Sequence, residues 1–152
     1  MTEGPDTQWN PHGLTANCVF SVLAYLKNVT VGQIVAETEE MQPGDHLGYG
    51  VSEELEAQLF ERCGLGKKPR SFHEWMDLEY FTRDGYPGLY AVQYDLGGQY
   101  EGFGHMLVLD LSNDVPSKWI DPQTGTPNLQ ALQSALKWRL RGPYPRPEAA
   151  AD

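Results

Sequence analysis

The sequence places a cysteine, Cys18, near the start of the strongly apolar stretch from Thr15 to Leu26. That stretch predicts a central, buried helix, because its side chains are apolar on nearly every side. The unpaired N–H groups and the dipole at a helix N-terminus stabilise an anion, so this position favours the thiolate form of the side chain. Cys18 is therefore a candidate nucleophile.

A thiolate nucleophile needs a base, and histidine is the usual one. His105 is the strongest candidate, because it opens the apolar segment GHMLVLDL and follows the glycine-rich connection LGGQYEGFG. A rigid support on one side and a pliable approach on the other keep a functional side chain both fixed and accessible. The other histidines lie in an expected N-terminal arm, a loop and a helix start, at His12, His46 and His73.

Asp121 ends the short segment KWID, which is expected to be the next strand. If the turn SNDVPS between the two strands is tight, Asp121 lies beside the start of the His105 strand. The alternative is that Asp121 only builds a turn, because Asp-Pro followed by Thr-Gly is ordinary turn chemistry. Together, a cysteine, a histidine and an aspartate in this order are the parts of a thiol nucleophile, its base and the group that orients the base.

Three segments resemble the motifs of the papain-like fold toxins, a family of bacterial polymorphic-toxin and effector domains described as glutamine deamidases. The segments are NCVFSVLAYL, GHMLVLDL and WIDPQTG, and the resemblance runs from Asn17 to about Gly125. It implies that Cys18 is the nucleophile, His105 the general base and acid, and Asp121 the orienting residue. It implies neither a metal nor a cofactor.

Two supporting roles fall on other residues. Gln123 ends the DPQ of the third motif, and we expect it to fix the turn through a hydrogen bond. In the wider papain pattern, a glutamine shortly before the cysteine helps to form the oxyanion hole. Here the nearest upstream glutamine is Gln8, ten residues before Cys18, with a proline and a glycine between them. Gln8 and Asn17 are therefore both candidates for the second oxyanion donor.

The resemblance implies an α+β, papain-like cysteine-enzyme fold with an N-terminal central helix and a small antiparallel sheet. The length of the chain and the lack of a domain boundary along it predict one domain over residues 1–152. The implied reaction converts a glutamine of a target protein to glutamate through a thioester intermediate. The implied setting is a secreted or delivered effector that acts in the cytoplasm of a target cell. Its expected partners are the target protein and a cognate immunity protein.

The residues alone leave other functions open. Proteolysis and transamidation pass through the same kind of thioester, so a papain-like protease or a transglutaminase fits the same trio. A non-catalytic papain-like module that binds a partner protein would make Cys18 dispensable. A metal-dependent hydrolase would use His12, His46, His73 and Asp45, but these residues show no recognisable metal-ligand spacing.

Hydrophobic periodicity and turn residues predict the elements that must hold the site. Helices come first and an antiparallel meander follows, which is an α+β order. The helix expected at 52–64 has Ser52 as its cap and Gly64 as its stop, and a last helix over 128–140 follows from four leucines at helical spacing. Residues 1–14 are expected to form an arm and 143–152 a loose tail. The remaining helices are expected at 17–28, 29–40 and 73–84, and the strands at 89–95, 105–111 and 118–121.

The net charge of −10 opposes nucleic-acid binding, because phosphate backbones are held by clustered lysines and arginines. No apolar stretch is long enough for a membrane span, and the N-terminus lacks the basic and apolar regions of a cleavable signal peptide. We therefore expect neither a nucleic-acid nor a membrane partner. Cys18 and Cys63 are expected to be free thiols, since neither CxxC nor Cys/His metal spacing occurs, and Cys63 is interpreted as structural.

Overall fold

The computed structural model describes residues 18–41, 53–95, 104–111 and 118–146. An antiparallel sheet with the strand order β1-β5-β2-β3-β4 forms its centre. The fold is α+β with a small antiparallel sheet, as the sequence predicts. The strands are β1 (Arg70–Phe72), β2 (Gly88–Asp95), β3 (Gly104–Leu111), β4 (Lys118–Ile120) and β5 (Lys137–Tyr144). The helices are α1 (Cys18–Lys27), α2 (Val31–Glu37), the short 3-10 helix η1 (Glu39–Met41), α4 (Glu53–Arg62), α5 (Trp75–Asp84) and α6 (Leu129–Gln133).

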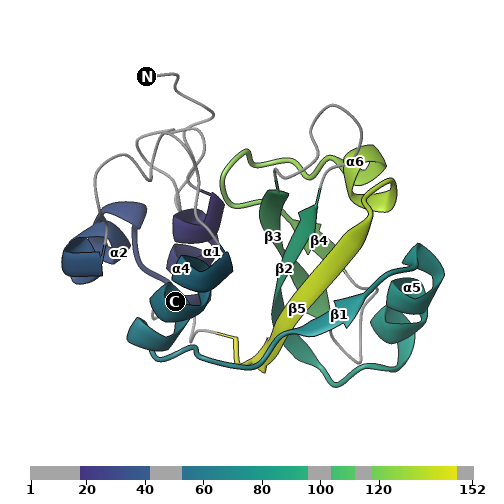
Figure 1. Ribbon diagram of the computed structural model, residues 1–152, viewed down its shortest axis with the longest axis horizontal. Coiled ribbons are helices and arrows are strands. Elements are labelled where there is room, and N and C mark those ends of the chain that lie inside the picture. Colours follow the sequence, from purple (N-terminus) through teal and green to yellow (C-terminus); the bar gives the residue numbers. More distant parts are fainter. Residues whose placement is uncertain (1–17, 42–52, 96–103, 112–117, 147–152) are drawn as a thin grey trace, which may run out of the picture.

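Helices lie on both sides of the sheet (Figure 1). One face packs against α1, α2 and α4, and residues such as Ala91 and Val108 point into that core. The other face packs against α5 and α6, and residues such as Val92 and Leu107 point into a second core. Because successive residues of a strand point to opposite faces, β2 and β3 contribute to both cores and are apolar almost throughout.

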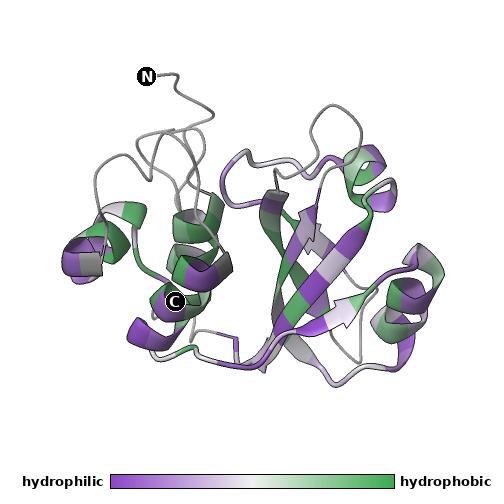
Figure 2. Ribbon diagram, viewed as in Figure 1, coloured by the Kyte–Doolittle hydropathy of each residue, from purple (hydrophilic) through white to green (hydrophobic). Residues whose placement is uncertain are grey.

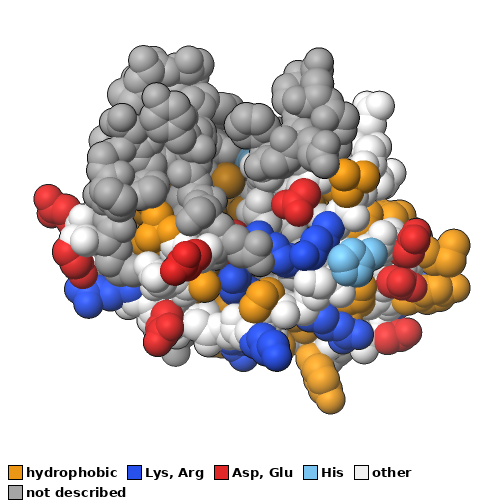
Figure 3. Space-filling view, in the orientation of Figure 1, with side chains coloured by type: hydrophobic (Ala, Val, Ile, Leu, Met, Phe, Trp, Pro, Cys, Tyr) orange, Lys and Arg blue, Asp and Glu red, His pale blue; other side chains and the backbone are white. Residues whose placement is uncertain are grey.

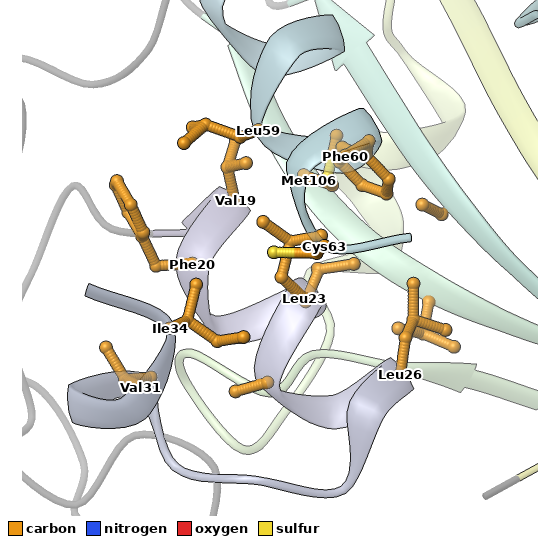
Figure 4. Close-up of a cluster of buried hydrophobic side chains, with 14 of the residues drawn as sticks. Val19, Phe20, Leu23, Leu26, Val31, Ile34, Leu59, Phe60, Cys63 and Met106 are labelled. Carbon is orange, nitrogen blue, oxygen red and sulfur yellow. The ribbon is translucent and has the colours of Figure 1, made fainter. Parts of the chain in front are cut away.

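The helix α1 is the central helix that the sequence predicts. Seven of its ten residues are buried, and Figure 2 shows its ribbon as largely hydrophobic. Val19, Phe20 and Leu23 pack against side chains from α2 and α4, including Ile34 and Leu59 (Figure 4). This burial fixes the helix and therefore the position of its first residue, Cys18. Within the described residues no single helix is long and apolar enough to cross a membrane, although α1 and α2, bent by 100°, reach that length and composition as a pair.

The glycine at the end of α4 stops the helix as expected. Gly64 has a φ of +77°, in the left-handed region that glycine adopts without strain. The Gly64 N–H donates to the carbonyl of Glu61 at 3.0 Å, and the Leu65 N–H donates to the carbonyl of Phe60 at 2.8 Å. These two bonds form a Schellman motif, which satisfies the last carbonyls of the helix. Ser52, the expected cap at the other end, lies outside the described residues.

Cys63 lies at this helix end and is buried in the core between α1 and α4 (Figure 4). Burial raises the pKa of its thiol, and the nearby Glu37 carboxylate adds to that effect. Both cysteines are free thiols. These surroundings fit the structural interpretation of Cys63.

The prediction of a helix over 128–140 is wrong. Only α6 is helical there, and β5 begins at Lys137. Trp138 and Leu140 enter the core on the α5 side, and Arg139 between them points to the other face and contacts α4. The segment therefore follows the period of two of a strand rather than the helical spacing of its leucines.

Two further differences from the prediction concern the end of β5 and the strand that pairs with it. The tail expected from residue 143 begins later, because Pro143 and Tyr144 belong to β5 and Tyr144 is buried. The sequence patterns do not indicate β1, which pairs with β5 in the register Ser71 with Arg139 and forms an edge of the sheet. The predicted meander is correct, because β2, β3 and β4 are neighbours in that order.

Candidate active site

His105 and Asp121 are in direct contact on neighbouring strands. The Nε2 atom of His105 lies 2.7 Å from the Oδ2 atom of Asp121. The strand register explains this contact, because Val108 on β3 pairs with Ile120 on β4. Continuing that register places Asp121 opposite Leu107, one diagonal step from His105 on the same face of the sheet. The expected proximity of the two residues is therefore present.

Cys18 completes the group. As the first residue of α1, it hydrogen-bonds to the side chain of His105. Since Nε2 is paired with Asp121, Nδ1 is the ring nitrogen that is available to the sulfur of Cys18. Cys18 is half-buried and the His105 side chain is 19% exposed, so the site is accessible to solvent. α1, β3 and the turn after β4 thus bring the predicted trio together.

Asp121 also builds the turn that follows β4. Its Oδ1 atom accepts hydrogen bonds from the backbone N–H groups of Gln123 at 3.0 Å and Thr124 at 3.1 Å. Its other oxygen faces His105. The two interpretations of Asp121 are therefore compatible, because each carboxylate oxygen has one of the two roles. Gln123 is buried and helps to fix the turn through its backbone N–H.

The protonation of the pair follows from its contacts. Burial alone disfavours the imidazolium, but hydrogen bonds to Asp121 and Cys18 outweigh burial and raise the pKa of His105 to about 10. Burial also disfavours the carboxylate of Asp121, but the hydrogen bond from His105 outweighs it, so the pKa of Asp121 is lowered. At neutral pH the two side chains are therefore an imidazolium and a carboxylate.

Tyr94 belongs to the site, although sequence reasoning missed it. It is the cross-strand partner of His105 on β2, and the two rings meet edge to face, with centroids 5.7 Å apart. Burial, together with the nearby Asp121 and Cys18, raises the pKa of Tyr94 to about 12, so its phenol stays neutral. The ring therefore restricts the orientation of the imidazole. Only the register of β2 on β3 would have revealed this contact.

The remaining candidates are not part of the described site. Gln8 and Asn17 lie outside the described residues, so the second oxyanion donor stays a prediction. His12, His46 and Asp45 of the metal alternative also lie outside them. His73 is exposed. Among the described residues, no group of three or more histidine, cysteine, aspartate or glutamate side chains is placed to hold a metal ion.

No protein-family model matches the chain, and no curated protein matches it either. The likeness of its three motifs to the papain-like fold toxins therefore stays a prediction. The function has to be argued from the chemistry of the site.

Proposed function

We propose that the protein is a cysteine acyl-transfer enzyme, and specifically a papain-like glutamine deamidase that acts on a target protein as a delivered effector. The observation that carries the proposal is the chain of contacts from Cys18 through His105 to Asp121. A thiol nucleophile, its base and an orienting carboxylate require this arrangement. The choice of glutamine deamidation among acyl transfers, and the effector role, rest on the resemblance of the three motifs.

The location of the nucleophile supports the papain-like comparison. Cys18 is the first residue of a buried helix that packs against one face of an antiparallel sheet, and His105 is the second residue of a strand in that sheet. At the start of α1, the backbone N–H of Cys18 has no carbonyl four residues earlier in the helix to accept it. That N–H is therefore a suitable first donor for an oxyanion.

In the first half of the reaction, the Cys18 thiolate attacks the carboxamide carbon of the substrate glutamine. The carbonyl oxygen becomes an oxyanion, which the Cys18 N–H stabilises. When the tetrahedral intermediate collapses, the C–N bond breaks and the His105 imidazolium donates its proton to the leaving nitrogen. Ammonia departs and a thioester remains on Cys18. The high pKa of His105 suits this step, because it keeps the proton in place until it is needed.

In the second half, His105 is neutral and accepts a proton from water. The resulting hydroxide attacks the thioester carbon, the C–S bond breaks, and glutamate leaves with the thiolate restored. Asp121 stabilises the imidazolium and holds the ring in the orientation that faces the sulfur. The net change on the target is one amide replaced by one carboxylate, which removes two hydrogen-bond donors and adds a negative charge.

The proposal is tested by intact-mass analysis of candidate target proteins after incubation with the wild type and with Cys18→Ala. A deamidase adds about one mass unit per modified glutamine, because NH2 is replaced by OH. The variant should give no change. Peptide mapping then locates the modified glutamine.

The same measurement separates the other functions. Fragments in place of the small gain would identify a protease. With a primary amine added to the mixture, incorporation of the amine would identify a transglutaminase. An identical effect of the wild type and Cys18→Ala on a target that both bind would favour the non-catalytic binding module and contradict the proposal.

A further inference from the structure

The open edge of the sheet borders a pocket that is not part of the site formed by Cys18, His105 and Asp121. β1 is the first strand in the sheet order, and no strand among the described residues pairs with its outer side. Beside this edge, β1 and α5 line a pocket of about 610 Å³, which is in the size range of ligand sites. None of Cys18, His105 and Asp121 lines this pocket, so the pocket is separate from the candidate active site.

The walls of the pocket combine residues of the edge strand β1 with aromatic residues of α5 and the segment after it. Ser71 and Phe72 of β1 form one side, Tyr80 and Phe81 of α5 form the other, and Tyr86 follows the helix. Tyr80 and Tyr86 are 54% and 79% exposed. Large aromatic side chains that are this exposed are typical of interaction sites. On the right of Figure 3, hydrophobic and acidic side chains lie next to each other over the position of α5.

The charges around the pocket favour a cation. Asp77 and Asp84 line it, whereas Arg70 is the only arginine or lysine in its lining. Arg70 already lies over two rings of the chain itself, 5.0 Å from the centre of Phe72 and 5.3 Å from the centre of Phe81. The two carboxylates are therefore available to an incoming positive charge, which the net charge of −10 of the whole chain also attracts.

The rings in this region already bind cations within the chain. Besides Arg70, Arg83 lies over Tyr80 at 5.6 Å from the ring centre. Among the described residues, no lysine or arginine lies over Tyr86, which is the most exposed large hydrophobic residue of the described chain. A lysine or arginine from another molecule would find an aromatic face and two carboxylates there.

We propose that this pocket binds an extended, basic segment of a partner protein. The segment adds as a further strand to the open edge of β1, which supplies main-chain hydrogen bonds. One lysine or arginine of the segment lies against Tyr86 and pairs with Asp77 and Asp84. The pocket is a docking site outside the catalytic site, so it would hold a partner whether or not Cys18 is present.

The proposal is tested by fluorescence anisotropy with a labelled hexapeptide of alternating lysine and valine. A hexapeptide of alternating glutamate and valine is the charge control. The double variant Asp77→Asn/Asp84→Asn removes the two pocket carboxylates. The variant Glu39→Gln/Glu54→Gln, at two exposed positions elsewhere, removes the same number of charges and controls for general attraction to an acidic protein.

We expect the lysine peptide to bind the wild type and Cys18→Ala equally, and the glutamate peptide not to bind. The pocket variant should bind about tenfold more weakly, and the Glu39/Glu54 variant should match the wild type. A lysine peptide with alternate backbone nitrogens methylated should lose binding, because it cannot donate to β1. Equal losses in both double variants, unchanged binding of the methylated peptide, or no binding of the lysine peptide would overturn the proposal.

Discussion

Two clusters of buried charged side chains among the described residues can be compared. In the Cys18–His105–Asp121 site, the imidazole lies between a thiol and a carboxylate, and its side chain is 19% exposed. In the other place, Glu56 of α4 pairs with two arginines of β5, Arg139 at 3.2 Å and Arg141 in closer contact. No side chain of this second cluster is more than 7% exposed.

The two places differ in whether their charge can be removed. Histidine can release its proton and become neutral, whereas the guanidinium of arginine stays charged in proteins. The first site is also open to solvent and contains a nucleophile, and the second is sealed between α4 and β5. Burial of charge alone therefore does not identify a catalytic site. A catalytic site is identified by a titratable group that lies beside a nucleophile and within reach of solvent.

The largest effect is expected for Asp121→Asn on catalysis. Its Oδ1 can still accept the two N–H groups of the turn, but an NH2 group replaces the oxygen that faces His105. That donor makes Nε2 an acceptor and moves the ring proton to Nδ1, toward the sulfur. Turnover of an identified glutamine substrate should fall by about four orders of magnitude, as in serine protease triads. Near wild-type turnover would reduce Asp121 to a turn residue.

The same variant should leave the fold nearly intact. Because His105 can lose its proton, Asp121→Asn should lower the free energy of unfolding by less than the loss of a partner from a buried ion pair does. Urea denaturation monitored by tryptophan fluorescence measures this difference. A loss of stability as large as the one expected when Glu56 is replaced would contradict this difference between a histidine that can become neutral and arginines that cannot.

The next effect is expected for Glu56→Gln, on stability rather than catalysis. The substitution removes the carboxylate that pairs with both buried arginines, Arg139 and Arg141, and neither arginine can become neutral. Removing one partner of a buried ion pair costs about 3–5 kcal/mol of unfolding free energy. Glu54→Gln, at an exposed position of the same helix, is the control and should change stability little. If both variants are equally stable, the cluster contributes nothing specific.

The smallest effect is expected in the pH dependence of stability. The pKa of His105 is about 10 in the folded protein and about 6.5 when it is unperturbed. Its pairing with Asp121 therefore contributes fully below about pH 6.5, and the contribution is lost as the pH rises toward 10. The stability difference between the wild type and Asp121→Asn should shrink over this range. The difference for Glu56→Gln should stay constant there, because arginine does not titrate. A constant difference for Asp121→Asn would contradict the pairing.

Much of the fold can be predicted from the sequence because its elements carry local signals. The apolar run of α1, the stop at Gly64 and the strands of the meander each depend on residues within a few positions of one another. The order of Cys18, His105 and Asp121 along those elements was enough to predict that they meet. The tyrosine on the neighbouring strand was missed, since Tyr94 reaches His105 only through the register of two strands.

The C-terminal segment could not be predicted because its signals are not local. Leu132 and Leu140 fit a helical spacing, and Arg139 and Arg141 are of a residue type that usually faces solvent. In the structure both arginines are buried, and what makes their burial tolerable is Glu56, more than 80 positions earlier in the chain. β1 could not be predicted from the sequence either, because it is only three residues long and depends on its pairing with β5.

The most direct test of the central claim is the rate at which iodoacetamide alkylates each cysteine at pH 7, read by peptide mass analysis. Cys18 should react at least about tenfold faster than the buried Cys63, and His105→Ala should abolish most of that advantage. Removing the imidazole opens the site, so slower labelling in the variant cannot reflect poorer access. Equal rates for the two thiols, or an unchanged rate for Cys18 in His105→Ala, would contradict the proposal that His105 activates Cys18.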